Sequence, residues 1–282
     1  MAVHFHVLGS GSSGNSSLLE VNGFGVLIDI GFGPRSLAGR LPPAPGFWDR
    51  VHAALLTHVH GDHWNENTLK RLRLRGIPLQ CHAEHAIDLR YASSAFAALA
   101  DAGLVRHYEA DTPMELGAGC RCTPLPLSHD GGETFGFRFN GPRQERWALG
   151  YAADLGCWDK ALARGLADVD VLALEFNHDV GLQYQSGRSP DLIRRVLSDR
   201  GHLSNVQAAD LFAAVLRQSR PGRLRHLVQL HLSRQCNKPE LARWVARLAV
   251  ERSAAPVEIH TACQASAGPS LVLAGREFAE IG

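Results

Sequence analysis

The sequence predicts an α/β protein, and two of its features carry that prediction. Short apolar runs alternate with glycine-rich or polar loops along the chain, and segments with helical spacing of apolar residues lie between them. The chain has 282 residues, 45% of them apolar, which is sufficient to build one large domain with a sizeable core. We therefore expect a single domain over residues 1–282.

Five apolar runs predict β-strands, and each one leads into a loop of glycine or polar residues. In chain order they cover residues 4–8, 25–29, 51–57, 169–175 and 224–230. Functional side chains in α/β folds gather where strands end. The loops after these runs are therefore the predicted location of a site.

Five further segments predict α-helices from the spacing of their apolar residues. They cover residues 66–75, 84–100, 190–200, 206–219 and 239–251. In the last segment, Leu241, Trp244 and Leu248 recur at helical spacing, and Pro239 suits the first turn of a helix. The alternation of these segments with the strands supports the α/β class.

The composition requires that any basic surface for a charged partner be local. Lys and Arg number 29 against 28 Asp and Glu, so a net charge of +1 gives no overall field that attracts nucleic acid or a membrane. No run approaches the roughly 18 apolar residues that span a bilayer, and no secretory signal begins the sequence. We expect a cytoplasmic protein without a membrane partner. Fifteen histidines form an unusual surplus, which directs attention to metal binding and proton transfer.

The strongest motif is Thr-His-Val-His-Gly-Asp-His at residues 57–63, directly after an apolar run. Two histidines at positions i and i+2 of an extended segment point the same way, so His58 and His60 can bind one metal ion. A turn after them leaves Asp62 and His63 to face a second ion close by.

This His-x-His-x-Asp-His run resembles the signature of the metallo-β-lactamase fold. The resemblance implies a four-layer αβ/βα sandwich. It also implies three further ligands in a fixed order: a His, an Asp and a final His, each after a strand. His129, Asp154 and His231 are the candidates in this sequence.

By the same resemblance, the ligands divide between two divalent metal ions. His58, His60 and His129 would hold one, Asp62, His63 and His231 would hold the other, and Asp154 would bridge them. The donor types suit zinc, manganese or iron equally. Two ions about 3.5 to 4 Å apart hold a bridging hydroxide as nucleophile, so the predicted reaction is hydrolysis.

Residues outside the ligand set indicate which bond is hydrolysed. The Gly/Ser loop at 9–16 exposes backbone N–H groups and hydroxyls, and we expect Ser10, Ser12 and Asn15 to bind phosphate. The loop lacks the lysine of a P-loop.

Two later segments place polar side chains at the end of a predicted strand and at the start of a predicted helix. Asn177 and His178 follow the run at 169–175, while Ser204 and Asn205 lie at the start of a predicted helix, where an anion is favoured. We expect Asn177, Ser204 and Asn205 to contact phosphate. His202, and secondarily His178, would donate a proton to the leaving oxygen.

Taken together, these segments resemble the YycJ family, also called WalJ or VicX, over residues 4–273. The motifs include Ser-His-Asp, Ala-Asp-Leu-Gly, Leu-Glu-Phe-Asn-His-Asp, Gly-His-Leu-Ser-Asn and His-Leu-Ser-Arg-Gln-Cys-Asn-Lys-Pro-Glu-Leu-Ala. Ala153 and Cys236 depart from the family pattern, but neither is a ligand. The stretch between Asp154 and His231 is too short for the β-CASP domain that related RNA nucleases insert there.

The resemblance implies a dinuclear metal-dependent phosphodiesterase, specifically a 5′-to-3′ exonuclease with DNA rather than RNA as its substrate. In this hypothesis Asp62 and Asp154 orient the hydroxide. Two alternatives stay open from the residues alone. One is a small-molecule hydrolase acting on a cyclic phosphodiester or a thioester, and the other is a non-catalytic regulatory protein that binds metal.

Overall fold

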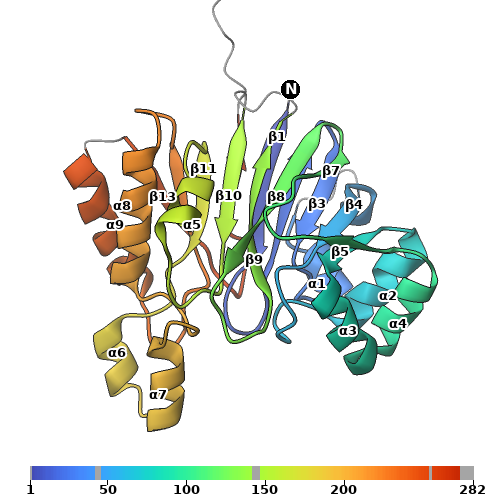
Figure 1. The fold of residues 1–282 in the computed structure, drawn as a ribbon, viewed down its shortest axis with the longest axis horizontal. Coiled ribbons are helices and arrows are strands. Elements are labelled where there is room, and N and C mark those ends of the chain that lie inside the picture. The colour runs from blue at the N-terminus through green and yellow to red at the C-terminus, as the bar shows by residue number, and fades with distance from the viewer. Residues whose placement is uncertain (1, 42–45, 142–146, 254–255, 274–282) are drawn as a thin grey trace, which may run out of the picture.

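The computed structural model describes residues 2–41, 46–141, 147–253 and 256–273. Two seven-stranded sheets pack face to face, and helices cover the outer face of each sheet (Figure 1). This arrangement confirms the predicted four-layer αβ/βα sandwich.

The first sheet has the strand order β14-β1-β2-β3-β4-β5-β6. Its strands are β1 (Val3–Gly9), β2 (Ser16–Val21), β3 (Phe24–Ile28), β4 (Val51–Leu55), β5 (Leu79–His82), β6 (Val105–Tyr108) and β14 (Ser270–Val272). Pairing is antiparallel from β14 to β3 and parallel from β3 to β6. The parallel half therefore brings the carboxyl ends of β3 and β4 to one edge.

The second sheet has the order β13-β12-β11-β10-β9-β8-β7. Its strands are β7 (Met114–Gly117), β8 (Cys120–Leu127), β9 (Thr134–Asn140), β10 (Ala148–Ala152), β11 (Val171–Glu175), β12 (His226–Leu230) and β13 (Glu258–Thr261). The strands from β10 to β13 run parallel, and those from β7 to β10 run antiparallel. The carboxyl ends of β10, β11 and β12 therefore lie together.

Helices form the two outer layers. The first sheet carries α1 (Pro34–Ala38), α2 (Glu66–Arg75), α3 (Ala83–Ala92) and α4 (Ser94–Asp101), with a 3-10 turn at Phe47–Asp49. The second carries α5 (Lys160–Gly165), α8 (Asn205–Gln218) and α9 (Pro239–Ser253). Helices α6 (Val180–Gln185) and α7 (Pro190–Leu197) project past the sheets at the lower edge of Figure 1. Among the described residues, no helix has both the length and the apolar character required to cross a membrane.

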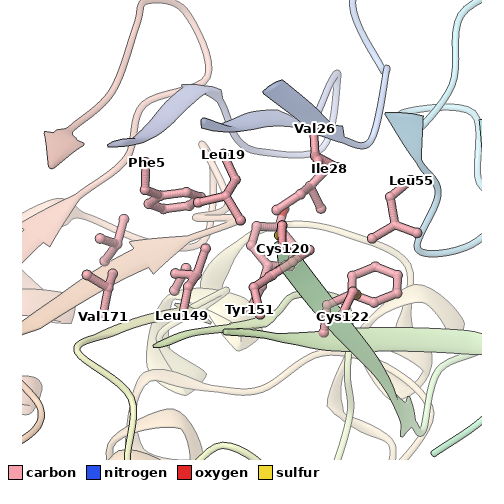
Figure 2. Packing of buried hydrophobic residues seen from close by; sticks show 14 of the residues in the cluster. Phe5, Leu19, Val26, Ile28, Leu55, Cys120, Cys122, Leu149, Tyr151 and Val171 are labelled. Carbon is pink, nitrogen blue, oxygen red and sulfur yellow. The ribbon is translucent and has the colours of Figure 1, made fainter. Parts of the chain in front are cut away.

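The main core lies between the two sheets (Figure 2). Alternate residues of each strand face it, as the two-residue period of a strand requires: Val3, Phe5 and Val7 on β1, and Leu149 and Tyr151 on β10. On β10, Ala148 and Ala152 face outward and pack against the helices, whereas His4 and His6 of β1 are only partly buried. Strands whose two faces are both buried, such as β10 and β11, read as continuous apolar runs.

The five predicted strands and five predicted helical segments are present with small differences in their bounds. The run at 51–57 leaves the sheet after Leu55, because the N–H and hydroxyl of Thr57 bond the Asp29 carboxylate instead of a strand. The segment at 84–100 is two helices. Ser93 is extended (φ −139°) and its hydroxyl accepts the Phe96 N–H as the cap of α4. The segment at 190–200 stops at Leu197.

Candidate metal centre

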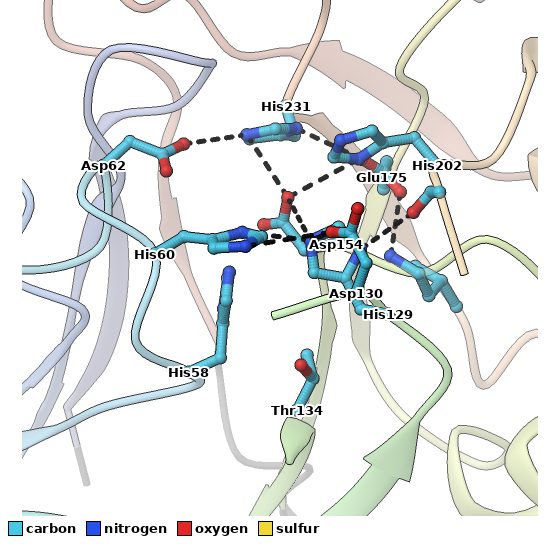
Figure 3. Close-up of polar contacts among 12 residues, drawn as sticks. His58, His60, Asp62, His129, Asp130, Thr134, Asp154, Glu175, His202 and His231 are labelled. Carbon is cyan, nitrogen blue, oxygen red and sulfur yellow. Dashed lines mark hydrogen bonds and ion pairs between the residues drawn. The ribbon is translucent and has the colours of Figure 1, made fainter. Parts of the chain in front are cut away.

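The seven predicted ligand residues lie where strands of both sheets end (Figure 3). Residues 58–63 follow β4 in the first sheet, while His129 follows β8, Asp154 follows β10 and His231 follows β12 in the second. The centre thus forms only when the two sheets pack together.

The donor atoms of these residues converge in overlapping groups, and within each group they lie within 4.8 Å of one another. One group is His58, His60 and His129. A second is Asp62, His63 and His231, and a third joins His58 and His63 to Asp154. Because the groups share members, the seven side chains form one connected cluster of donors.

Asp154 occupies the middle of this cluster. Its carboxylate oxygens lie 3.0 Å from His63 Nε2, 3.5 Å from His231 Nε2 and 3.9 Å from His129 Nε2. The backbone at Asp154 has a φ of 62°, a left-handed conformation that Asp tolerates better than most side chains. Burial alone would raise the pKa of Asp154, but the surrounding histidines, above all His231 and His63, hold it well below its usual range.

The cluster has the chemistry of a cation site. His58 Nε2 is buried and has no hydrogen-bond partner among the residues that the structure describes. Burial holds the pKa of His58 well below its usual value, so the ring is neutral and has a lone pair available. A Cβ atom at Gly131 would lie 2.6 Å from the His58 ring, so only glycine fits beside this ligand. A buried nitrogen lone pair beside other histidines and the Asp154 carboxylate fits a divalent ion.

Side chains behind the ligands hold part of the cluster in place. His63 Nδ1 lies 2.8 Å from Asp29 Oδ2, and the Thr57 hydroxyl donates to the same carboxylate. The Asn15 amide donates to Asp62 Oδ2 at 3.1 Å. Burial would lower the pKa of His63, but Asp29 and Asp154 raise it well above its usual value. Since Asp29 occupies Nδ1, the other ring nitrogen of His63 is directed at the centre.

Glu175 links two histidines on the other side of the centre. Its Oε1 lies 2.8 Å from His202 Nδ1 and 3.1 Å from His231 Nδ1, and its Oε2 accepts the N–H of Leu155 and of Leu203. Burial would raise the pKa of Glu175, but His202 and His231 lower it to about 2. Burial would lower the pKa of His202, but the nearby Glu175 carboxylate raises that pKa above its usual value. The ring of His202 stacks on that of His231 and remains partly open to solvent.

Two residues predicted to bind phosphate hold the loop together instead. Ser10 Oγ accepts the His231 N–H and donates to Asn15 Oδ1, which also accepts the Gly11 N–H. Both side chains are buried and their hydrogen bonds are used inside the protein. Their contacts therefore favour a positioning role. Ser12 is exposed and lines a pocket beside His202.

The later predicted residues also have internal partners. The Asn177 amide donates to the His231 carbonyl, Ser204 caps α8 by accepting the Gln207 N–H, and Asn205 exchanges hydrogen bonds with Asn237. These three are buried, so their geometry does not favour the expected contact with phosphate. His178 lies outside the ligand groups and burial lowers its pKa to about 4, which makes it a poor proton donor.

Sequence reasoning missed three carboxylates at this site: Asp29, Glu175 and Asp130. Asp29 and Glu175 carry a signal that was available, since each is a carboxylate at the end of an apolar run. Asp130 follows His129, and its Oδ1 lies 3.8 Å from His60 Nε2.

A pocket opens beside the centre, on the side of α7. It is lined by Ser12, Asp130, Arg188, Leu192, Arg195, Val196, Gly201, His202 and Gln235. Arg195 forms an ion pair with Asp130, while Arg188 contacts the neutral side chains of Gln235 and Gln183. The net charge of +1 for the whole chain gives no sign of these two arginines in one pocket.

The fold and this cluster of donors define a metal-dependent hydrolase of the metallo-β-lactamase fold. Residues 25–223 match the family described as the beta-lactamase superfamily domain, and the chain belongs to that family. Exodeoxyribonuclease YycJ of Bacillus anthracis is 28% identical over 254 residues, which cover 86% of this chain and 87% of that protein.

Exodeoxyribonuclease WalJ of Streptococcus pneumoniae is 26% identical over 238 residues, 84% of each chain. Among solved structures, the metallo-β-lactamase fold protein YhfI from Bacillus subtilis matches with a TM-score of 0.67 and 16% identity, over 96% of this chain and 100% of that one. The likeness to YhfI concerns the fold, and the two exodeoxyribonucleases support the resemblance to the YycJ family.

Proposed function

We propose that this protein is a metal-dependent nuclease that removes nucleotides from the 5′ end of DNA. One observation carries the proposal: seven His and Asp side chains converge directly beside a pocket that contains His202 and two arginines. The relatives named as exodeoxyribonucleases match most of the chain and support DNA as the substrate.

The proposed ligand sets follow the groups of donors. His58, His60 and His129 would hold one divalent ion, Asp62, His63 and His231 would hold the other, and Asp154 would be a ligand between the two sets. When bound, such ions lower the pKa of a coordinated water and polarise a phosphoryl oxygen. The donor set suits zinc, manganese or iron.

Side chains of the chain have three roles in this proposal: orienting the water, protonating the leaving oxygen and contacting phosphates. Asp62 and Asp154 orient the attacking water as hydrogen-bond acceptors. His202 donates a proton from Nε2 to the leaving oxygen, because Glu175 occupies its Nδ1 and keeps the ring charged. Arg188 and Arg195 lie where they can contact phosphates of the bound strand.

The test uses the purified protein with Mn²⁺ or Zn²⁺ and with single- and double-stranded DNA and RNA labelled at either end. We expect release of mononucleotide from 5′-labelled DNA and a descending ladder from 3′-labelled DNA. Cleavage of RNA alone would contradict the choice of substrate. Intact oligonucleotides together with hydrolysis of bis(p-nitrophenyl) phosphate or an acyl thioester would replace the proposal with a small-molecule hydrolase. Metal binding without any turnover would favour a regulatory protein.

A further inference from the structure

A second group of metal-ligating side chains lies away from the candidate metal centre, at the amino-terminal ends of β12 and β13. It consists of His226, Glu258 and His260, whose donor atoms lie within 4.8 Å of one another. We propose that these three side chains, which we call the strand-end cluster, bind a divalent ion of the zinc type.

Strand register places the three side chains on one face of the sheet. His226 pairs with Glu258 on the neighbouring parallel strand, and His260 follows two residues after Glu258. In-register residues and residues two apart project to the same side. Val228 and Leu230 continue that face of β12 into the core between the sheets. The strand-end cluster therefore lies at the rim of the core, with the two histidines largely buried and Glu258 open to solvent.

The distances between donor atoms match those around a tetrahedral metal ion. His226 Nδ1 lies 3.2 Å from His260 Nε2 and 3.4 Å from Glu258 Oε2, and His260 Nε2 lies 3.7 Å from Glu258 Oε1. Zinc bonds of about 2.0 to 2.1 Å at tetrahedral angles separate neighbouring donors by about 3.3 Å. Two His and one Glu leave one position for water, as in zinc sites with three protein ligands.

The backbone around the strand-end cluster is fixed by hydrogen bonds. The His226 N–H donates to the Asp170 carbonyl, and the Glu258 N–H donates to the Arg225 carbonyl. Arg225 is the cation next to the cluster in sequence, and its guanidinium lies 3.3 Å from the Asp170 carboxylate, which also pairs with Arg223 at 2.8 Å. An ion can therefore bind with little rearrangement of the strands.

The strand-end cluster is independent of the candidate metal centre. His226 and His231 are five residues apart on one extended segment, which separates them by roughly 16 Å. Because β13 pairs with β12 alone among the strands that the structure describes, a shared ion would also tie this edge to the rest of the sheet.

The test measures zinc bound per chain after the full-length protein has been stripped with a chelator and dialysed against Zn²⁺. We expect the wild type to hold one more zinc than His260→Ala. Glu258→Gln should weaken that site by at least about tenfold, since even side chains behind the ligands contribute this much. His107→Ala, an exposed histidine of β6 outside every group, serves as the matched control and should bind as the wild type does.

Two further measurements distinguish the strand-end cluster from the candidate metal centre. Asp154→Asn disturbs the candidate metal centre and should retain the zinc of the strand-end cluster, so failure of one site is distinguished from failure of the other. Co²⁺ should give a tetrahedral absorption band in the Asp154→Asn protein that becomes weaker, at the same Co²⁺ concentration, when Glu258→Gln is added. Because Glu258 is exposed, that substitution leaves the fold intact even if His260→Ala unfolds the protein. Equal zinc content and equal Co²⁺ spectra with and without Glu258→Gln would overturn the proposal.

Discussion

The two sides of the candidate metal centre differ in how their side chains are held. On one side His63 is completely buried, with Asp29 and Thr57 behind it and Asn15 beside it. On the other side His60 is 32% exposed, and Asp130 connects it to Arg195 at the pocket. We call these the buttressed side and the open side.

This difference separates two tasks that we propose for one cluster of candidate ligands. The buttressed side fixes ring orientation and charge before any ion binds, which is the usual role of carboxylates behind metal-ligating histidines. The open side leaves space and charge for a substrate. Substitutions on the first side should therefore affect metal affinity, and substitutions on the second should affect substrate binding.

The largest expected effect is that of Asp154→Asn, because Asp154 contacts both sides. Asn fits the left-handed backbone but removes the charge among the histidines. Phosphodiesterase activity should fall by at least about 1,000-fold, the loss of several kcal/mol of electrostatic stabilisation. The measurement is kcat/KM on labelled DNA. Asp168→Asn, which changes another left-handed aspartate far from the centre, should retain activity, and equal losses in the two variants would contradict this role.

Asp29→Asn tests the buttressed side directly. Without the carboxylate behind His63, metal affinity should fall by about 10- to 100-fold. Asp130→Asn is the matched substitution on the open side and should change metal affinity by less than about threefold. Competition with a chromophoric chelator gives both values. Similar losses in the two variants would remove the distinction between the sides.

Arg188→Gln tests the open side as a surface for nucleic acid. Arg188 has only neutral partners among the contacts described, so its charge is available to a phosphate. The KM for DNA should rise several-fold at physiological salt with little change in kcat, and the log–log salt slope should decrease by about one. Arg247→Gln on α9 is the control. An unchanged salt dependence would show that the strand does not reach this pocket.

The smallest expected effect concerns stability away from the centre, at the contact of Glu20 with Arg50 and His6. Burial would raise the pKa of Glu20, but His6 and Arg50 lower it to about 2. A carboxyl with a lowered folded-state pKa stabilises the fold above about pH 4.5, and this contribution disappears as the pH falls towards 2. Glu20→Gln should therefore cost about 1 kcal/mol of unfolding free energy at pH 6 and nothing near pH 2.

Chemical denaturation across this pH range measures the effect. Glu240→Gln removes an exposed pair with Arg243 and should change stability by much less. A pH-independent cost for Glu20→Gln would contradict the assigned cause. DNA hydrolysis at neutral pH should be unchanged in both variants, because neither residue contacts the centre.

The convergence of the seven candidate ligands could be predicted from the sequence because they lie after strands in a recognisable order. The side chains behind the candidate ligands were harder to predict from the sequence. Asp29 contacts His63 through the loop after β4, and Glu175 contacts His202 because residues 201–205 fold back on β11. The phosphate contacts of Ser10 and Asn15 are predicted from a Gly/Ser loop, and that of Asn205 from its position at the start of a helix. Burial of these segments gives the three side chains partners inside the protein.

We propose that the cluster of His and Asp side chains carries out the hydrolysis of DNA. The most direct test compares the wild type with Asp62→Ala on 3′-labelled DNA, with the metal content and the unfolding midpoint measured on the same samples. We expect the wild type to shorten the strand and Asp62→Ala to leave it intact while retaining a near-native unfolding midpoint. An active, folded Asp62→Ala protein would contradict the account.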